Sequence, residues 1–265
     1  YAEAAEMLRE HLRNEVGRLY QTKCPKTGKL AEAKYFLWVK TVECGSCGKQ
    51  NDLFPNYLVA QDVRHTANVF TCGHCGSLYE SKDREHPGPC PTCRKRPSTD
   101  HVARRNLSRC LHCDAVISYP TASIPGHRLF AIEYYLPKML ANGSRKGRLF
   151  KVPDAEDLAK FVEAEKRLHE TCPQFIPQDA IPEGDETQRL LRWGYRHYHE
   201  LFNARQLLGL ELSCQWISKF PDDRIREALA TNLSDLLRYQ NMLCRYDTMA
   251  LKSLDIFSFT GSQWG

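Results

Sequence analysis

Apolar residues recur every three or four positions at the start of the chain and again in its second half. Such spacing predicts helices with one apolar face. In residues 1–20 the apolar stripe consists of Ala5, Leu8, Leu12, Val16 and Leu19. After Pro153 and Asp154, which open the next helix, the stripe consists of Leu158, Phe161, Val162 and Leu168.

Capping signals predict where three further helices begin. Asp185 with Gln188, and Asn203 with Gln206, have the spacing of capping boxes. The helix after Asn203 carries Leu207, Leu208, Leu210, Cys214 and Ile217. A last helix, starting near Asp222, carries Ile225, Leu229, Leu233, Leu236 and Leu243 at helical spacing.

Between these helical parts lie short runs rich in β-branched and aromatic residues, which predict strands. They cover residues 34–43, 56–63, 67–71, 115–119, 127–136 and 148–152, and the ANGSRKG stretch at 141–147 reads as a turn. The predicted fold class is therefore α+β. We expect three regions: an N-terminal helix at 1–23, a strand-rich module at 24–120 and a strand-then-helical subdomain at 121–265.

Composition excludes two classes of protein. The chain has 265 residues, of which 42% are hydrophobic, and no run approaches the roughly 18 apolar residues of a membrane-spanning helix. The first residues lack the layout of a secretory signal, so we expect a cytoplasmic protein with no membrane partner. Because the chain begins inside a helix and without Met, we expect it to be a fragment of a longer protein.

Eight of the twelve cysteines form four C-x-x-C pairs: Cys44/Cys47, Cys72/Cys75, Cys90/Cys93 and Cys110/Cys113. Without a signal peptide, this spacing indicates thiolates bound to metal in a reducing compartment. Zn²⁺ takes four ligands in a tetrahedron, so eight thiolates complete two structural Zn²⁺ sites and leave no position open for catalysis. Redox dithiols and an iron–sulfur centre are the alternatives. The former usually stand alone at a helix start, and nothing here has the close-set run of the ferredoxins.

Two ways of pairing these C-x-x-C turns are compatible with the spacing. Sequential pairing joins neighbours along the chain, whereas nested pairing joins Cys72/Cys75 to Cys90/Cys93 and places Cys44/Cys47 with Cys110/Cys113 around the outside. We favour nested pairing, because residues 94–109 show no strand-like alternation. This scheme also places the strands at 35–43, 57–71 and 115–119 around the outer site. The 24–120 module is then a double zinc ribbon built from small antiparallel sheets.

Other cysteines and histidines fit structural roles better than metal binding. Cys24, in KCPKTG, resembles half of a C-x-x-C turn without its second thiol. With eight thiolates already completing two sites, the nearby histidines are expected at the surface or beside the ligands; they are His65, His74, His86, His101 and His112.

Positive charge gathers in two stretches. The formal charge is +5, and two Zn²⁺–thiolate centres at −2 each remove four charges and leave +1, so any preference for nucleic acid has to come from local patches. Residues 94–109 hold one acid, Asp100, and six cations: Arg94, Lys95, Arg96, Arg104, Arg105 and Arg109. This cluster suits contacts to DNA phosphate, or equally a solvated loop that offsets the zinc centres.

The second stretch, residues 188–206, interleaves arginines with aromatic residues. The cations are Arg189, Arg192, Arg196 and Arg205, and the aromatic residues are Trp193, Tyr195, Tyr198 and Phe202. Such residues stack on unpaired bases, but a core of aromatic rings with cations on its outer face explains the pattern at least as well.

Three blocks together resemble adenine-specific DNA methyltransferases that carry a zinc ribbon. They are AEAKYFLWVKTVECGSCG, WGYRHYHELFNARQLLGL and LLRYQNMLCRYDTMALKSLDIFS. The resemblance implies that the double zinc ribbon and the helical subdomain are inserted in a Rossmann-like α/β methyltransferase fold, between its cofactor and catalytic motifs. It implies methyl transfer from S-adenosylmethionine to adenine N6, with the base flipped out of double-stranded DNA. Members occur in bacterial restriction-modification and phage-defence loci, which makes the rest of the methyltransferase chain and other defence-system proteins expected partners. Nested pairing also fits this family, whose single-ribbon members keep the outer two C-x-x-C turns.

The chain departs from that family in two motifs. It contains neither a Gly-rich F-x-G-x-G loop for the cofactor nor a [DNS]-P-P-[YFW] catalytic tetrapeptide. S-adenosylmethionine is therefore implied for the full-length protein only, and no catalytic residue carries over to this chain. The alternative hypothesis is a non-enzymatic zinc-ribbon adaptor that binds nucleic acid or protein.

Overall fold

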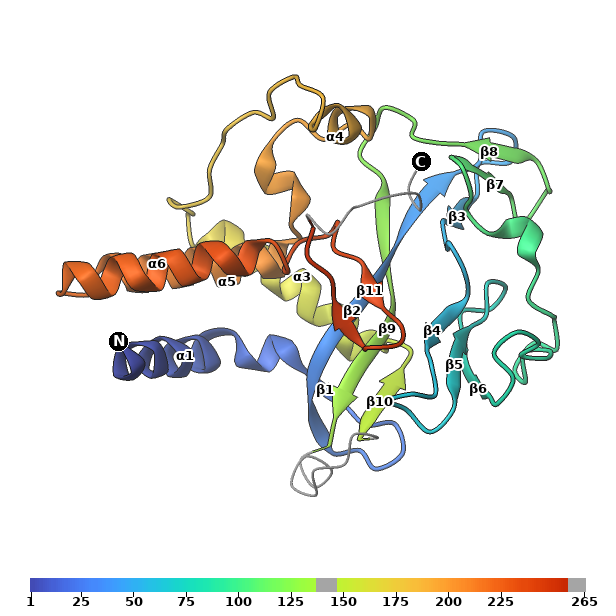
Figure 1. The fold of residues 1–265 in the computed structure, drawn as a ribbon, viewed down its shortest axis with the longest axis horizontal. Coiled ribbons are helices and arrows are strands. Elements are labelled where there is room, and N and C mark those ends of the chain that lie inside the picture. Colours follow the sequence, from blue (N-terminus) through green and yellow to red (C-terminus); the bar gives the residue numbers. More distant parts are fainter. Residues whose placement is uncertain (137–146, 257–265) are drawn as a thin grey trace.

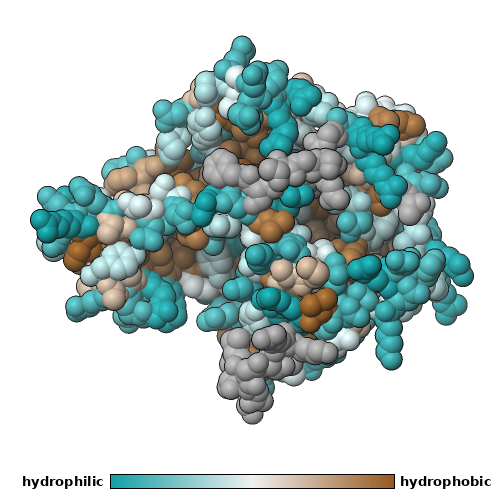
Figure 2. Space-filling model, in the orientation of Figure 1, coloured by the Kyte–Doolittle hydropathy of each residue, from teal (hydrophilic) through white to brown (hydrophobic). Residues whose placement is uncertain are grey.

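The computed structural model describes residues 1–136 and 147–256, so most of the turn expected at 141–147 lies outside the described residues. Helices gather at one end of the molecule, where α1, α5 and α6 run side by side at the left of Figure 1. Small β-hairpins gather at the other end, and the long strands β2 and β9 lie between the two groups. On the face drawn in Figure 2, hydrophilic residues predominate and hydrophobic residues show in smaller groups between them.

The central sheet has five strands in the order β1-β2-β9-β10, with β3 also paired to β2, and every pairing is antiparallel. Its strands are β1 (Gln21–Lys23), β2 (Leu30–Glu43), β3 (Gln50–Asp52), β9 (Gly126–Tyr135) and β10 (Arg148–Lys151). The β2–β9 pairing extends from Glu32 opposite Tyr135 to Thr41 opposite Gly126. This sheet therefore joins strands from both sides of residue 120.

The other strands form three small antiparallel sheets. They are β4 (Leu58–Ala60), β5 (Asn68–Thr71) and β6 (Leu78–Ser81); β7 (Leu107–Arg109) and β8 (Val116–Ser118); and β11 (Tyr246–Asp247) and β12 (Lys252–Ser253). All six predicted strands are confirmed, although β4 is shorter than expected. The sequence did not predict the other strands, each of two to four residues: β1, β3, β6, β7, β11 and β12. Of these, β7 lies at the end of residues 94–109, where no strand-like alternation was expected.

The helices confirm most of the predicted starts. They are α1 (Ala2–Val16), α3 (Ala155–Glu170), α4 (Gln188–Arg192), α5 (Ala204–Ser218) and α6 (Asp223–Leu237), with 3₁₀ turns at Gly17–Tyr20, Thr99–His101 and Tyr198–Leu201. Asn203 and Gln206 form the predicted capping box of α5. The Asp222 side chain accepts a hydrogen bond from the N–H of Ile225 and so caps α6.

Three details of the helical prediction are wrong. Leu158 and Val162 are 48% and 67% exposed, because α3 packs on the sheet and on α5 through its other residues. Asp185 does not cap α4: the N-cap is Thr187, whose hydroxyl donates to the carbonyl of Gly184 within the preceding turn. Leu243 lies beyond the end of α6 and packs in a separate apolar cluster with Tyr195.

Aromatic and ionic contacts join α3 to the sheet. The Phe161 ring meets Phe36 and Trp38 edge-on, at centroid distances of 5.7 Å and 4.8 Å. Beside them Lys151 of β10 forms a buried ion pair of 2.7 Å with Asp157, whose carboxylate also accepts a hydrogen bond from the Thr22 hydroxyl. The helical end is thereby attached to the sheet that leads to the cysteine-rich hairpins.

The structure of residues 1–136 and 147–256 bears on two expectations, a Rossmann-like sheet and the absence of a membrane-spanning helix. The strands there form only antiparallel pairs, so a Rossmann-like parallel sheet is not among them. None of the helices described there has the length and apolar character needed to cross a lipid bilayer.

Candidate metal centres and an adjoining cationic cleft

Each C-x-x-C pair lies in the same tight turn. At Cys44 the amide donates to the carbonyl of Lys49, and the amide of Gly48 donates back to the carbonyl of Cys44, at 3.0 Å and 2.8 Å. The same two bonds recur in the turns that start at Cys72, Cys90 and Cys110. The residue after the second cysteine has positive φ in every case, and glycine fills it in the first two turns, as Gly48 and Gly76. The backbone thus presents two thiols from one loop.

The thiols form two groups of four, and within each group the four sulfurs lie within 4.8 Å of one another. The outer cluster consists of Cys44, Cys47, Cys110 and Cys113, and the inner cluster consists of Cys72, Cys75, Cys90 and Cys93. The nested grouping is therefore the one that the fold adopts.

Distances between sulfur atoms distinguish a metal site from a disulfide. In the outer cluster the Sγ atoms of Cys44 and Cys113 are 3.7 Å apart, and in the inner cluster those of Cys72 and Cys93 are 3.6 Å apart. A disulfide bond measures about 2.05 Å, whereas a tetrahedron with Zn–S bonds of about 2.3 Å has edges of about 3.8 Å. None of the twelve cysteines is in a disulfide bond. The two clusters have the donor set and the dimensions of structural Zn²⁺ sites.

A separate small apolar core surrounds each cluster. The outer cluster packs with Val42, Leu53, Ile117 and Tyr119, and the inner cluster with Phe54, Tyr57, Phe70 and Tyr79. The expectation that the strands at 57–71 surround the outer site is therefore wrong. These strands lie at the inner cluster because β5 leads directly into Cys72. The Thr71 amide also donates a hydrogen bond to the carbonyl of Tyr57, which keeps that residue beside the same cluster.

Both clusters, as far as the structure describes the chain, consist of cysteine only. Cys24 lies in a turn with the same pair of backbone hydrogen bonds: its amide donates to the carbonyl of Lys29, and the amide of Gly28 donates to the carbonyl of Cys24. Thr27 occupies the place of a second cysteine in this turn. Cys24 is buried, and its sulfur accepts a hydrogen bond from the Tyr134 hydroxyl at 3.4 Å. His65, one of the histidines considered from sequence, contacts the carbonyl of Arg148 and the carboxylate of Glu80 instead.

The predicted phosphate-contacting cations lie on the segment that runs from the inner cluster to the outer one. All six are exposed: Arg94, Lys95, Arg96, Arg104, Arg105 and Arg109. Arg109 forms an ion pair of 3.1 Å with Asp114. The structure thus places these cations at the surface, on the segment between the inner and the outer cluster.

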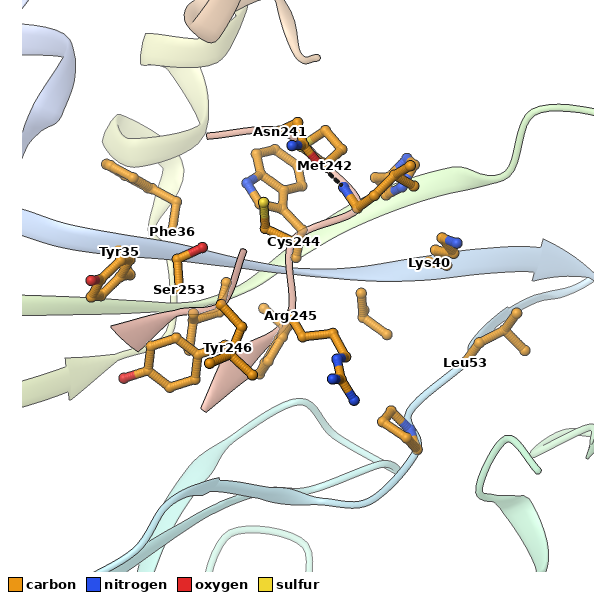
Figure 3. Close-up of a pocket in the computed structure, with 18 of the residues that line it drawn as sticks. Tyr35, Phe36, Lys40, Leu53, Asn241, Met242, Cys244, Arg245, Tyr246 and Ser253 are labelled. Carbon is orange, nitrogen blue, oxygen red and sulfur yellow. Dashed lines mark hydrogen bonds between the residues drawn. The ribbon is translucent and has the colours of Figure 1, made fainter. Parts of the chain in front are cut away.

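A cleft of about 910 Å³ lies beside this segment. One wall is β2 with Tyr35, Phe36 and Lys40, and the opposite wall is the segment 239–248, from which the Arg245 side chain points into the cavity (Figure 3). Residues of the 53–59 segment and of α4 complete the lining. The cleft was not predicted from the sequence, because its walls come from distant parts of the chain.

Positive charge predominates in the lining of the cleft. Of the lining residues that the structure describes, one is acidic, Asp247, and its carboxylate accepts hydrogen bonds from the amides of Met249 and Ala250. Seven are lysine or arginine: Lys34, Lys40, Arg105, Arg189, Arg192, Arg205 and Arg245. Arg105 belongs both to this cleft and to the exposed segment 94–109.

The polar groups at the α4 end of the cleft have shifted pKa values. The Lys40 ammonium lies 4.2 Å from the centre of the Trp193 ring, and burial, together with the charge of Arg189, lowers the pKa of Lys40 to about 8. Burial and the charge of Lys40 lower the pKa of His127 to about 4, so that His127 is neutral at pH 7. Since an anion near Lys40 would offset both effects, this end of the cleft is electrostatically suited to negative charge.

Arg205 lies in the lining at the α3 side and is 3% exposed. Its guanidinium carbon is 3.5 Å from the ring centre of Phe36 and 4.2 Å from that of Phe161, and one of its N–H groups donates to the Leu19 carbonyl. Burial lowers the pKa of Arg205 to about 10. Cation–π contacts hold this arginine within the core.

Residues of the arginine-aromatic stretch at 188–206 are divided between the cleft and the core. Arg189, Arg192 and Trp193 line the cleft, whereas Tyr195 is 1% exposed and belongs to the core. Comparisons with protein families, curated proteins and solved structures found no match to this chain. Fold and site together therefore define a mixed α+β protein with two Cys₄ clusters of the zinc-binding kind.

Proposed function

We propose that this chain is the zinc-binding, DNA-engaging portion of an S-adenosylmethionine-dependent adenine-specific DNA methyltransferase. The observation that carries the DNA-binding part is the position of the six exposed cations of 94–109, on a segment anchored by a Cys₄ cluster at each end. A fixed backbone lowers the conformational entropy that ordering those side chains on phosphate would cost. The methyltransferase part is supported by the sequence resemblance alone.

In this proposal Zn²⁺ has a structural role. Four thiolates saturate each tetrahedral ion, which leaves no coordination position for substrate. The eight cysteines hold the hairpins, and the arginines between them contact phosphate, where release of counterions favours binding. Interactions of this kind position the protein on DNA without reading its sequence.

Replacing Arg94, Arg96, Arg104 and Arg105 with Gln tests the phosphate interactions. We expect duplex binding to weaken alike for all sequences, and the slope of log affinity against log salt to fall by about 0.9 for each phosphate that is no longer neutralised. A control variant replaces four exposed cations of the helices, Arg9, Arg13, Lys166 and Arg224, and should keep the slope. An unchanged salt slope in the first variant would indicate that residues 94–109 form a solvated loop and do not contact phosphate.

Methyl transfer is tested by comparing this chain with the complete gene product. We expect the chain alone neither to bind S-adenosylmethionine nor to methylate adenine-containing duplexes, because it lacks both motifs, and we expect the complete protein to do both. Isothermal titration and a methyl-incorporation assay measure these properties. A complete protein that fails both assays would indicate the non-enzymatic adaptor.

A further inference from the structure

The cleft has features that duplex binding at the exposed segment does not use. Its volume of about 910 Å³ is near the upper end of the roughly 300–1,000 Å³ typical of ligand pockets. Among the residues that the structure describes, its lining includes seven cations and one carboxylate. A concave surface with this charge suits an anionic ligand that enters the cleft better than a duplex that lies across its opening.

Aromatic rings lie beside these cations at both ends of the cleft. At the α4 end the rings of Tyr119 and Trp193 are 5.7 Å apart, and Lys40 lies against Trp193. At the other end Tyr35 and Tyr246 meet edge-on at 5.4 Å (Figure 3). Aromatic rings placed along a cationic groove are the arrangement that binds single strands, because an unpaired base exposes the ring faces that stacking requires. In a duplex those faces are covered by neighbouring base pairs.

We propose that this cleft binds an unpaired stretch of DNA, with bases against Trp193 and Tyr246 and phosphates near Arg189, Arg192 and Arg245. The inference rests on the proposed function in that both assign DNA as the ligand. It adds a second DNA-binding surface, which shares Ala103, Arg105 and Asn106 with the segment 94–109. Duplex DNA on 94–109 and an unpaired strand in the adjoining cleft are then held side by side.

An acidic polypeptide is the other anionic polymer that the charge of the cleft admits. The aromatic residues favour the nucleic acid, because they supply stacking platforms at both ends, whereas acidic side chains have no ring faces to stack. Polyglutamate is therefore the competing probe in the test.

The test measures fluorescence anisotropy of a labelled short oligothymidylate with the zinc-loaded chain. The double variant Arg189→Gln/Arg192→Gln should weaken oligothymidylate binding at least tenfold and leave duplex binding within twofold. Both arginines are on the last turn of α4, and Arg192 is exposed, so the fold should tolerate the change. The control Arg13→Gln/Arg224→Gln removes the same charge from α1 and α6 and should change neither affinity.

Trp193→Leu tests the stacking interaction, and we expect it to weaken oligothymidylate binding about tenfold. Because Trp193 also packs against the outer Cys₄ core, circular dichroism and zinc content establish whether that variant is folded. If Trp193→Leu is not folded, the Arg189→Gln/Arg192→Gln variant alone decides whether the cleft binds oligothymidylate.

The outcomes separate this inference from the proposed function. Weaker duplex binding by the Arg94→Gln/Arg96→Gln variant with oligothymidylate binding retained supports two distinct surfaces. An unchanged salt slope in that variant contradicts the phosphate interactions but leaves the cleft standing. No oligothymidylate binding by the wild-type chain, or equal binding by the Arg189→Gln/Arg192→Gln variant, overturns the inference. Polyglutamate binding that depends on the same two arginines, and that exceeds oligothymidylate binding, would assign the cleft to an acidic polypeptide.

Discussion

At the scale of single residues, the ion pair between Lys151 and Asp157 is the clearest case of buried charge in this protein. The Lys151 side chain is 4% exposed and the Asp157 side chain 2% exposed, and Thr22 donates to the same carboxylate. Removing one partner leaves the other charge buried without compensation, which typically costs about 3–5 kcal/mol.

We therefore predict that Lys151→Met lowers the free energy of unfolding by about 3–5 kcal/mol, measured by urea denaturation. Lys166→Met is the control, because its ion pair with Glu170 is exposed and worth no more than about 1 kcal/mol. Equal effects of the two substitutions would show that the buried pair does not hold α3 on the sheet.

Lys40 gives a prediction about pH. Its pKa is about 8, because burial and Arg189 disfavour its charged form, and His127 beside it stays neutral above a pH of about 4. Lys40 is thus charged below pH 8 and neutral above it. Oligothymidylate affinity should fall as pH rises from 7 to 9, and Lys40→Arg should remove most of that fall, since arginine stays protonated. A pH-independent affinity in the wild-type chain would exclude Lys40 from the binding surface.

At the scale of elements, the turn after α4 shows how backbone packing positions the cleft. Gly194 has φ of 87°, and a Cβ atom there would lie 2.6 Å from the backbone of Ser123 and Ile124. Only glycine fits this approach. It holds Trp193 against Tyr119 and thereby fixes the α4 end of the cleft.

Gly194→Ala should therefore destabilise the protein by more than about 1 kcal/mol and shift the tryptophan fluorescence. The matched control is Gly184→Ala, four residues before α4, where an added Cβ meets only the Thr187 hydroxyl at 3.5 Å. If both substitutions have the same small effect, the close approach at Gly194 does not determine the position of Trp193.

Prediction from sequence succeeded at this scale where a signal was local. The strand at 34–43 and the α5 capping box depend on spacing within one segment. The nested grouping of cysteines is confirmed, although the gap at 94–109, expected to show no strand-like alternation, ends in the three residues of β7. The buried face of α3 was wrong at Leu158 and Val162, because the sheet partners Phe36 and Trp38 decide that face. The cleft could not be predicted, since Lys40 and Arg245 are brought to it only by tertiary structure.

At the scale of the whole molecule, the cysteine-rich end depends on its clusters. Both apolar cores at that end include cluster cysteines, whereas the helical end has separate cores around Leu208 and Leu229. Small hairpins with so little apolar interior usually require a metal to fold. The two clusters share no cysteine.

Cys90→Ser should consequently disturb the inner cluster and spare the outer one. We expect one Zn²⁺ to remain per chain, a lower melting temperature and weaker duplex binding. Cys172→Ser, which replaces an exposed cysteine outside both clusters, should keep the properties of the wild type. Loss of both ions from Cys90→Ser would mean that the two sites fold as one unit.

The central claim is that two closed thiolate sites organise this protein, and the zinc content of the chain tests it most directly. Elemental analysis of protein purified without chelator should give two Zn²⁺ per chain, because eight cysteines form two complete tetrahedra. One Zn²⁺ per chain, or none, would contradict this claim.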